Sequence, residues 1–191
     1  MLSLMAPTRV SYTETVDVSA EAADVFDDIR LQARLARWSA WPKETGSMCA
    51  LDSSPKRADG TVGARMVFVS KGRPIGHQEI VELIDQRLIA LELDGPGPPH
   101  RAFVRFEVEE LDAKLTRVHL HFVNELPRPF NAIWRFAGLS QWTRSMHKKD
   151  LAGLKAFSEP PHRDIDGRIV GRTPSLPNPY ETALPVPDKH K

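Results

Sequence analysis

Cysteine is scarce in this sequence: its 191 residues contain only one, Cys49. A single cysteine excludes an intramolecular disulfide, so we expect a reducing compartment and predict a cytoplasmic location. Cys49 has no histidine or second cysteine near it in the chain, which favours a small buried apolar side chain over a metal ligand. No phosphate-binding loop, dinucleotide fingerprint or nucleophile elbow occurs, and no cofactor is predicted.

A charge excess and a long apolar run are also missing. Lys and Arg number 26 against 25 Asp and Glu, whereas nucleic-acid-binding proteins usually have a strong basic excess, so no nucleic-acid partner is predicted. No segment approaches the ~18 consecutive apolar residues of a membrane span, and the N-terminal segment MLSLMAPTRV lacks the pattern of a signal peptide. We therefore expect no stable membrane insertion.

The apolar residues that are present, 41% of the chain, are enough for the core of one domain. The composition changes after Ser158, where seven of the sixteen prolines follow with a single aromatic residue, Tyr180. Such a segment buries too little apolar surface to offset the entropy of ordering it. The sequence predicts an ordered domain over residues 8–158 and a proline-rich, disordered tail over residues 159–191, whose PSLPNPY segment is a candidate for protein recruitment.

Within the ordered part, hydrophobic periodicity predicts a strand, two helices, six strands and a long helix, in that order. Short turns such as RADG, KGRP and LDAK separate the later strands, which indicates antiparallel pairing. Ser19 is the expected N-cap of the first helix. The predicted strands cover residues 9–18, 47–51, 61–70, 75–84, 88–93, 102–109 and 115–124, and the first two helices cover residues 19–29 and 30–38.

The final helix is predicted over residues 129–157, because no proline follows Pro129 within this range. At 1.5 Å per residue it would extend about 43 Å. A lone helix of this length must lie along another element, and only the concave face of the sheet is large enough. We therefore predict an α+β fold in which a strongly curved antiparallel sheet, in the order β-α-α-β6-α, wraps around a long C-terminal helix.

The order of elements and five segments resemble the START-like, or SRPBCC, superfamily, which has the helix-grip fold. The segments are VDVSAEAADVFDDI, RWSAWP, VELIDQRLIALEL, TRVHLHF and DLAGLKAF. The similarity extends over residues 8–159 and is greatest to the polyketide cyclase/dehydrase-like and lipid-transport-like branch. It implies a deep apolar cavity between the sheet and the long helix, with the helix pair at its mouth and a hydrophobic small molecule as the partner. It implies no particular catalytic residue, because this superfamily shares no catalytic motif.

Trp38 and Trp41 stand three residues apart where the second helix is predicted to end. In the fold that the sequence resembles, this position is near the cavity entrance, and an indole suits a partly hydrated rim. The alternative is that one of the two fills the core, and this alternative is favoured more for Trp41 than for Trp38.

The long helix combines a polar stripe with an apolar face. The stripe consists of Ser140, Thr143, His147 and Asp150. Unpaired polar groups are costly in a filled core, so the stripe indicates either a hydrated cavity or the solvent edge of the helix. Asp150 is one turn from His147 and could raise the pKa of the imidazole. The apolar face includes Ile133, Phe136, Leu139, Met146, Leu151, Leu154 and Phe157.

Alternation along the strands also directs side chains toward the cavity, and for residues 75–84 it leaves two orientations open. If Ile75, Val81 and Leu83 face inward, so do His77 and Glu79, and an apolar cavity would then contain a histidine and a carboxylate. With the opposite orientation both are surface residues. On the other strands the predicted inward residues include Val62, Ala64, Met66, Phe68, Phe106, Phe122 and Asn124.

His119 and His121 share one face of a predicted strand, a spacing that can bind zinc or iron. That face also carries Arg117 and lies opposite the apolar residues. A solvent-exposed pair is therefore favoured, and no metal site is predicted.

Basic side chains predominate on the long helix, where Asp150 is the single acid. The simpler interpretation is a solvated outer face. The alternative is transient contact of this helix, with an exposed Trp134 or Trp142, with an anionic membrane. The basic residues are Arg135, Arg144, Lys148, Lys149 and Lys155.

Three functions are consistent with these features, and the sequence predicts no oligomeric state. The favoured function is binding of a hydrophobic or aromatic small molecule, such as a lipid or a polyketide. The second is a cyclase or dehydratase whose histidine or carboxylate moves protons, and the third is a protein-interaction module that acts through the tail. The ligand-binding candidates are Trp38, Trp41, Met66, Phe68, His77, Phe106, Phe122, Asn124, Phe136, Ser140, Thr143 and His147, and the catalytic candidates are His77, Glu79, His147 and Asp150.

Overall fold

The computed structural model describes residues 7–52, 58–95, 101–159, 162–163 and 169–170. The chain divides into two compact units, residues 1–160 and 161–191. The described residues of the second unit form two short antiparallel strands, β8 (His162–Arg163) and β9 (Ile169–Val170). The PSLPNPY segment and most of the predicted disordered tail lie outside the described residues, and the domain boundary at Ser158 stays a prediction.

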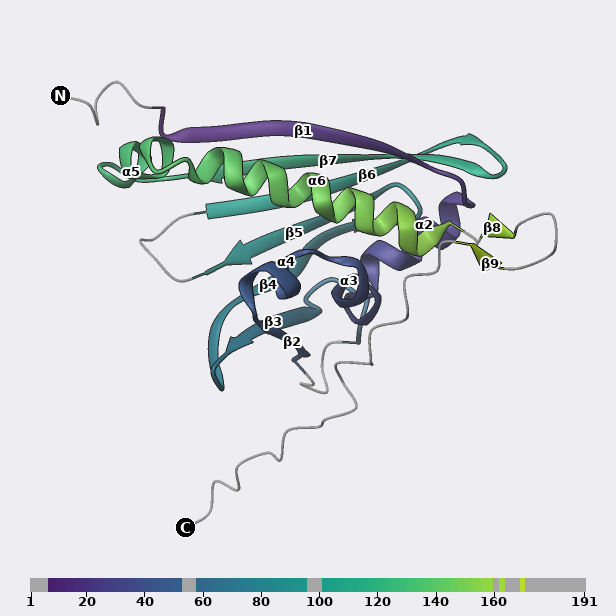
Figure 1. Cartoon of the computed structure of the whole chain (residues 1–191), viewed down its shortest axis with the longest axis horizontal. Helices are drawn as coiled ribbons and strands as arrows, with labels where there is room; N and C mark the ends of the chain where they lie inside the picture. Colours follow the sequence, from purple (N-terminus) through teal and green to yellow (C-terminus); the bar gives the residue numbers. More distant parts are fainter. Residues whose placement is uncertain (1–6, 53–57, 96–100, 160–161, 164–168, 171–191) are drawn as a thin grey trace, which may run out of the picture. The chain divides into compact units, whose positions relative to one another are not determined.

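The first unit is built on one seven-stranded antiparallel sheet in the order β1-β7-β6-β5-β4-β3-β2, and the sheet is curved (Figure 1). Strands that are neighbours in the chain pair from β2 to β7, and β1 pairs with β7 along its whole length. The predicted α+β fold is therefore confirmed. The strands are β1 (Arg9–Val18), β2 (Met48–Leu51), β3 (Arg65–Ser70), β4 (Arg73–Ile84), β5 (Leu88–Asp94), β6 (Arg101–Asp112) and β7 (Leu115–Glu125).

Three short helices connect β1 to β2: α2 (Ala22–Arg30), α3 (Gln32–Trp38) and α4 (Trp41–Thr45). The first two are the predicted pair, but α4 replaces a predicted loop. Its sequence suits a helix, because Pro42 lies in the first turn, where proline is tolerated, and Gly46 ends it with a φ of 63°. The predicted N-cap is also wrong, since Glu21 occupies that position and the Ser19 N–H donates to the Glu159 carboxylate at 2.9 Å.

The C-terminal helix is broken, and the prediction of one helix over residues 129–157 is wrong. Two helices, α5 (Phe130–Phe136) and α6 (Leu139–Ser158), are separated at Gly138, whose φ is 72°. This left-handed conformation ends a right-handed helix and is readily adopted by glycine. Because α5 takes its own direction, Ile133 and Phe136 leave the predicted inner face and are 57% and 64% exposed.

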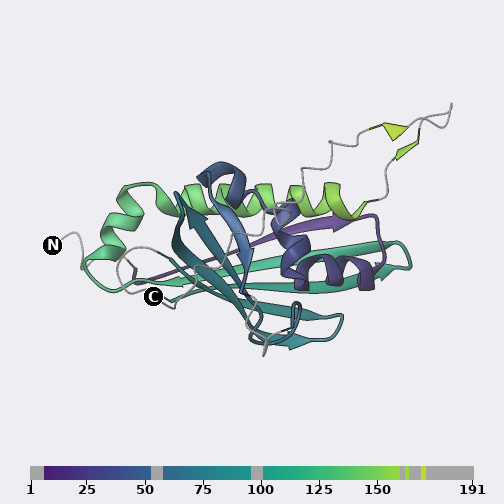
Figure 2. The ribbon, with the colours of Figure 1, turned by 90° about the horizontal axis from the view of Figure 1, so that it is seen from below.

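Helix α6 lies across the concave face of the sheet, alongside β1 and near α3 (Figures 1 and 2). The Lys155 ammonium donates to the Asp17 carbonyl of β1 at 2.6 Å. Gly153 faces the Trp38 carbonyl so closely that a Cβ atom there would lie 2.2 Å from the oxygen. Glycine at 153 therefore lets α6 approach the end of α3, which places Trp38 beside α6.

The apolar core lies between α2, the sheet and the C-terminal half of α6. Met66 is fully buried in it, on the inner side of the sheet as predicted. The inward orientation predicted for Val62 is wrong, because β3 begins only at Arg65 and Val62 lies in the preceding turn, 58% exposed. The other large, fully buried side chains include Phe26, Ile29, Ile80, Ile89, Leu120, Met146 and Leu154.

Candidate functional site

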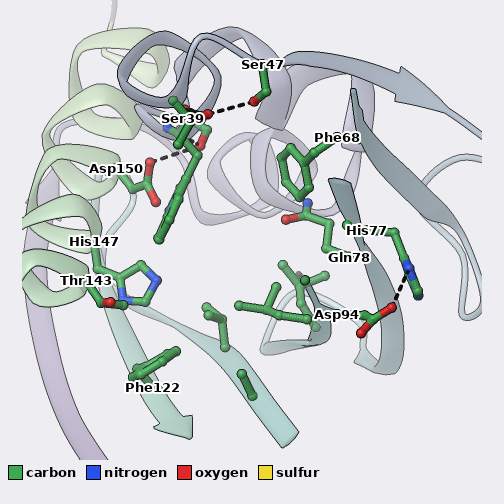
Figure 3. Close-up of a pocket in the computed structure, with 18 of the residues that line it drawn as sticks. Ser39, Ser47, Phe68, His77, Gln78, Asp94, Phe122, Thr143, His147 and Asp150 are labelled. Carbon is green, nitrogen blue, oxygen red and sulfur yellow. Dashed lines mark hydrogen bonds and ion pairs between the residues drawn. The ribbon is translucent and has the colours of Figure 1, made fainter. Parts of the chain in front are cut away.

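A cavity of about 350 Å³ opens between the sheet and helices α3, α4, α5 and α6. Figure 3 shows side chains of α6 on one side of this space and side chains of β3, β4 and β5 on the other. Its size and mostly apolar wall are typical of small-molecule sites. The described lining residues are Leu35, Trp38, Ser39, Trp41, Thr45, Ser47, Phe68, Ile75, Gly76, His77, Gln78, Leu91, Leu93, Asp94, Gly95, Ala102, Val104, Phe106, Phe122, Asn124, Trp134, Trp142, Thr143, His147 and Asp150.

The floor of the cavity consists of alternate residues of β6 and β7. Antiparallel pairing sets Phe122 opposite Val104 and Asn124 opposite Ala102, so these four side chains share the concave face. Met66, which was predicted to bind ligand, belongs to the core and is not part of the described wall. The predicted residues that do line the cavity from the sheet are Phe68, Phe106, Phe122 and Asn124, with His77 at its edge.

Trp38 at the end of α3 and Trp41 at the start of α4 have the opposite roles to those that the sequence favoured. Trp38 is only 6% exposed, its indole N–H donates to the Asp28 carbonyl at 2.9 Å, and its ring meets Phe106 edge-on. Trp41 is half-buried and makes an edge-to-face contact with the exposed Trp142, their ring centroids 5.2 Å apart. Both Trp38 and Trp41 line the cavity, but the rim is formed by Trp41 and Trp142.

His147 projects from α6 into the cavity, as Figure 3 shows, and is 2% exposed. Its Nδ1 atom and the Tyr12 hydroxyl of β1 are 2.8 Å apart, and its ring packs on Phe122 with the centroids 4.9 Å apart. Burial lowers the pKa of His147 to about 4, so the imidazole is neutral at physiological pH. The rise in this pKa that Asp150 could have caused does not occur, because burial sets the direction of the shift.

Asp150 is buried one turn further along α6 and binds the start of α4. Its Oδ1 atom accepts hydrogen bonds from the Ser39 hydroxyl at 3.0 Å and from the Ala40 N–H at 2.7 Å. Burial raises the pKa of Asp150 to about 6, although these hydrogen bonds act to lower it. The carboxyl group therefore holds α4 against α6 and titrates close to neutrality.

The rest of the predicted stripe is divided between the cavity and the surface. Thr143 lines the cavity, and its hydroxyl donates to the Leu139 carbonyl at 2.8 Å. Ser140 is half-buried and does not belong to the described wall. Phe136 is exposed on α5, so its predicted place in the cavity is wrong.

Strand β4 turns Gln78 inward, and His77 and Glu79 outward, which decides between the two orientations that the sequence left open. His77 touches only the edge of the cavity: its Nδ1 atom lies 3.4 Å from an Asp94 carboxylate oxygen, and Figure 3 shows the ring directed away from the interior. Glu79 forms an ion pair with Arg65 at 2.5 Å. Gln78, which sequence reasoning missed, lines the cavity and donates to the Gln32 side-chain carbonyl at 2.6 Å.

Two polar side chains of the wall, where β7 passes into α5, have buried atoms without a hydrogen-bond partner in the described part of the chain. Asn124 is 1% exposed, and neither its Oδ1 nor its Nδ2 atom has a partner among the described residues. The buried indole N–H of Trp134 likewise has none within that part of the chain. Of the two tryptophans that the sequence offered as an exposed membrane contact, Trp134 is half-buried and lines the cavity, whereas Trp142 is 45% exposed. The spacing of three between Trp134 and Asn131, another inward residue of α5, is the signal that could have placed Trp134.

The outer face of the sheet carries His119 and His121, on the solvent side as predicted. They are hydrogen-bonded to Thr15 and Thr13 of β1 at 2.9 and 2.8 Å. No group of three or more potential metal ligands occurs in the described ranges.

Two further sequence features are visible in the structure. Cys49 is buried as predicted, and burial raises the pKa of its thiol to about 12. Among the helices that the structure describes, none is long and apolar enough to cross a membrane.

Residues 9–159 match the protein family described as polyketide cyclase / dehydrase and lipid transport. This range includes every strand of the large sheet and all five helices α2–α6. No curated protein matches the chain.

Several solved structures are similar in fold. A Chromobacterium violaceum protein is 18% identical, with 81% of this chain and 99% of that one covered at a TM-score of 0.54. Truncated norcoclaurine synthase from Thalictrum flavum is 11% identical over 77% of this chain and 94% of that one, with a TM-score of 0.54. Major latex-like protein 151 of Panax ginseng is 13% identical over 81% of this chain and 100% of that one, with a TM-score of 0.53. Another structure of the Thalictrum enzyme is a complex with dopamine and hydroxybenzaldehyde.

Proposed function

Because the chain belongs to the polyketide cyclase / dehydrase and lipid transport family, as its resemblance to the SRPBCC superfamily implied, we propose that it binds a hydrophobic or aromatic small molecule between the sheet and α6. The observation behind the proposal is the cavity of about 350 Å³ and its mostly apolar wall. Each Å² of apolar ligand surface buried there would contribute roughly 25 cal/mol, which favours a lipid- or polyketide-like molecule.

A connected cluster of aromatic rings in the cavity wall favours a planar ligand, and the Trp41 and His147 ring centroids within it are 5.9 Å apart. Phe122 and His147 pack together on the inner side, and Trp41 and Trp142 form the rim. Aromatic pairs prefer stacked or edge-to-face geometry, which such walls can offer to a ring. Norcoclaurine synthase, which shares the fold, has been solved with two aromatic compounds, and this supports the proposal by analogy alone.

The test is to place the same bulky side chain on either face of β6. Val104→Trp fills the cavity. Phe103→Trp, at the preceding position of β6, places the same side chain on the outer face of the sheet. We expect wild type and Phe103→Trp to enhance the fluorescence of the uncharged probe N-phenyl-1-naphthylamine, and Val104→Trp to lose at least 90% of that enhancement (roughly a tenfold weaker affinity). Equal enhancement by all three proteins would show that the cavity is not the binding site.

Proton transfer in the same cavity is the second candidate function. Its support is that the cavity wall contains both a neutral His147 and Asp150, whose pKa of about 6 leaves it partly protonated near neutrality. Groups that titrate near the working pH are suited to general acid–base catalysis. A cyclase or dehydratase needs such a group beside a bound carbonyl compound. Of the catalytic candidates, Asp150 and His147 line the cavity, and His77 touches only its edge.

A ketone with an acidic α-proton separates this function from binding alone. We would follow exchange of the C1 protons of 2-tetralone for deuterium by NMR, with the protein and with its Asp150→Asn and His147→Gln variants. A catalyst should accelerate exchange, and loss of the essential base should reduce the rate by ~100-fold or more. Exchange at the buffer rate with tetralone bound would favour a carrier.

Transient membrane contact through α5 would give a lipid-like ligand a route to the cavity. Phe130, Ile133 and Phe136 are exposed on α5, while Trp134 of the same helix lines the cavity. Residues 126–149 include five Lys and Arg and no Asp or Glu, which suits an anionic surface. The cytoplasmic location stays a prediction from cysteine usage.

A further inference from the structure

We propose that the ligand is uncharged and presents a hydroxyl, or another group that both donates and accepts a hydrogen bond, to Asn124 and Trp134. The inference rests on the proposed function, because it names the chemistry of the molecule that occupies the same cavity. It concerns the end of the cavity where β7 leads into α5.

Asn124 is the central observation. It lies on the concave face of β7, opposite Ala102 of β6 and Val10 of β1, and is almost completely buried. Its carbonyl oxygen and its amide nitrogen both lack partners among the described residues. A buried amide without partners lowers the stability of a protein, so a ligand that satisfies both atoms gains affinity and specificity there. Such a ligand must offer a donor and an acceptor.

Trp134 adds a second donor at the same end of the cavity. Only the short connection Leu126–Pro129 separates β7 from α5, and Trp134 lies one turn into α5. Its buried indole N–H is also without a partner in the described part of the chain, and an indole can only donate. The combined set, an amide and an N–H, matches a hydroxyl or phenol oxygen that accepts one bond and donates another.

Other polar side chains of the wall are bound to protein partners. Thr143 donates to Leu139, His147 bonds Tyr12, and Asp150 accepts from Ser39 and Ala40. These contacts join structural elements, so they differ from the unsatisfied atoms of Asn124 and Trp134.

The charge of the ligand follows from the same wall. No lysine or arginine occurs among its described residues, so a carboxylate or phosphate would lose its hydration without gaining a cationic partner. A cation would find one buried carboxylate, Asp150, which already accepts two hydrogen bonds. Fatty acids and phospholipid headgroups are therefore disfavoured relative to neutral alcohols, phenols and hydroxylated polyketides.

Three naphthalenes of one shape test both parts of the inference. 2-Naphthol presents a hydroxyl, 2-methylnaphthalene a methyl group of similar size, and 2-naphthoate a negative charge. Their affinities would be measured by displacement of N-phenyl-1-naphthylamine from wild type, Asn124→Leu and Trp134→Phe. Val123→Leu, a change at the adjacent outward position of β7, is the control.

We expect the affinity ratio of naphthol to methylnaphthalene to fall about tenfold in Asn124→Leu and severalfold in Trp134→Phe, with no change in Val123→Leu. Naphthoate should bind wild type at least tenfold more weakly than naphthol. Trp134 is only half-buried, so its variant supplies the measurement even where Asn124→Leu does not fold.

The possible outcomes distinguish the role of Asn124 and Trp134 from the proposed binding function on which it rests. Failure of all three compounds to displace the probe would contradict the proposed cavity binding itself. Displacement with a ratio that is the same in every variant would leave the proposed function standing and overturn the role of Asn124 and Trp134. Tighter binding of naphthoate than of naphthol would overturn the requirement for a neutral ligand.

Discussion

The polar groups on α6 and those at the junction of β7 and α5 face the same cavity but differ in their partners. On α6, Thr143, His147 and Asp150 each form hydrogen bonds with the protein. At the junction, Asn124 and Trp134 have buried polar atoms with no partner among the described residues. Most buried polar groups in proteins are satisfied, so within the described cavity wall the junction is the exception.

This difference separates side chains that hold the cavity walls in place from side chains that are available to bind a ligand. The bond from Asp150 to Ala40 ties α6 to α4, and the bond between His147 and Tyr12 ties α6 to β1, so these side chains position the walls. Unsatisfied groups position nothing and lower stability. Proteins often retain such local defects at sites that a ligand completes.

The largest effect that tests the comparison is the pH dependence of stability. His147 has a pKa near 4 when folded and 6.5 ordinarily, so between these values the unfolded chain binds the extra proton and stability rises with pH. Asp150 has a pKa near 6 when folded and 3.8 ordinarily, so the folded chain holds the extra proton and stability falls as pH rises through that window. Each effect amounts to about 3 kcal/mol across its window.

His147→Gln and Asp150→Asn should therefore tilt the stability curve in opposite directions. Relative to wild type, the free energy of unfolding of His147→Gln should decrease as pH rises from 4 to 6.5, and that of Asp150→Asn should increase from 3.8 to 6. Urea denaturation at several pH values measures both. Curves that run parallel to wild type would mean that these two groups do not titrate as buried side chains.

A smaller effect compares two indole N–H groups. Trp38→Phe leaves the Asp28 carbonyl without its donor and removes packing in the core, so we expect a loss of about 2–3 kcal/mol. Trp134→Phe removes a donor that has no partner in the described residues, so its stability should change by less than about 1 kcal/mol. Equal losses in thermal or urea unfolding would show that the Trp134 N–H has a partner after all.

The sequence predicts the fold well because its cues are local and repeated. Alternation predicts β1 over the observed residues, and the short turns predict the antiparallel order from β2 to β7. The break at Gly138 was not predicted, since a glycine within a helical pattern does not by itself show that its φ is positive. That single dihedral angle removes Phe136 from the cavity and directs Trp134 into it.

The site is less predictable because it depends on which face of the sheet each strand residue points to and on contacts between residues far apart in the chain. In β4 the register shifts between Ile80 and Glu82, so the period of two is interrupted and the orientation of Leu83 does not determine that of His77. The inward orientation of Asn124 follows from alternation, but its lack of partners appears only once β1, β6 and α5 surround it. Likewise, the proximity of Asp150 to Ala40, more than a hundred residues away, is invisible in a local pattern.

A third test concerns the exposed apolar side chains of α5. Ile133→Ser should reduce binding to vesicles that contain anionic phosphatidylglycerol by about two- to fivefold, because Ile133 is 57% exposed beside basic residues. Val62→Ser, at a site that is 58% exposed on the β2–β3 connection, is the matched control and should bind as wild type does. Comparison with flotation on neutral phosphatidylcholine vesicles measures how much of the binding is electrostatic. Equal binding by the two variants would remove α5 as the membrane contact.

The smallest expected effect is that of removing residues 161–191. The groups that hold the C-terminal end of α6 lie before this segment: Glu159 accepts from the Ser19 N–H and pairs with Lys155 at 2.7 Å. A chain ending at Pro160 should therefore keep its melting temperature within about 2 °C, since a shift of that size corresponds to less than about 1 kcal/mol in a domain of this length. It should also bind 2-naphthol with unchanged affinity, because we propose that the unsatisfied atoms of Asn124 and Trp134 form hydrogen bonds with a small molecule and not with the tail. A several-fold gain in naphthol affinity on truncation would instead identify the chain's own tail as a competing occupant of the cavity. It would then contradict the conclusion that Asn124 and Trp134 lack hydrogen-bond partners in the absence of a ligand.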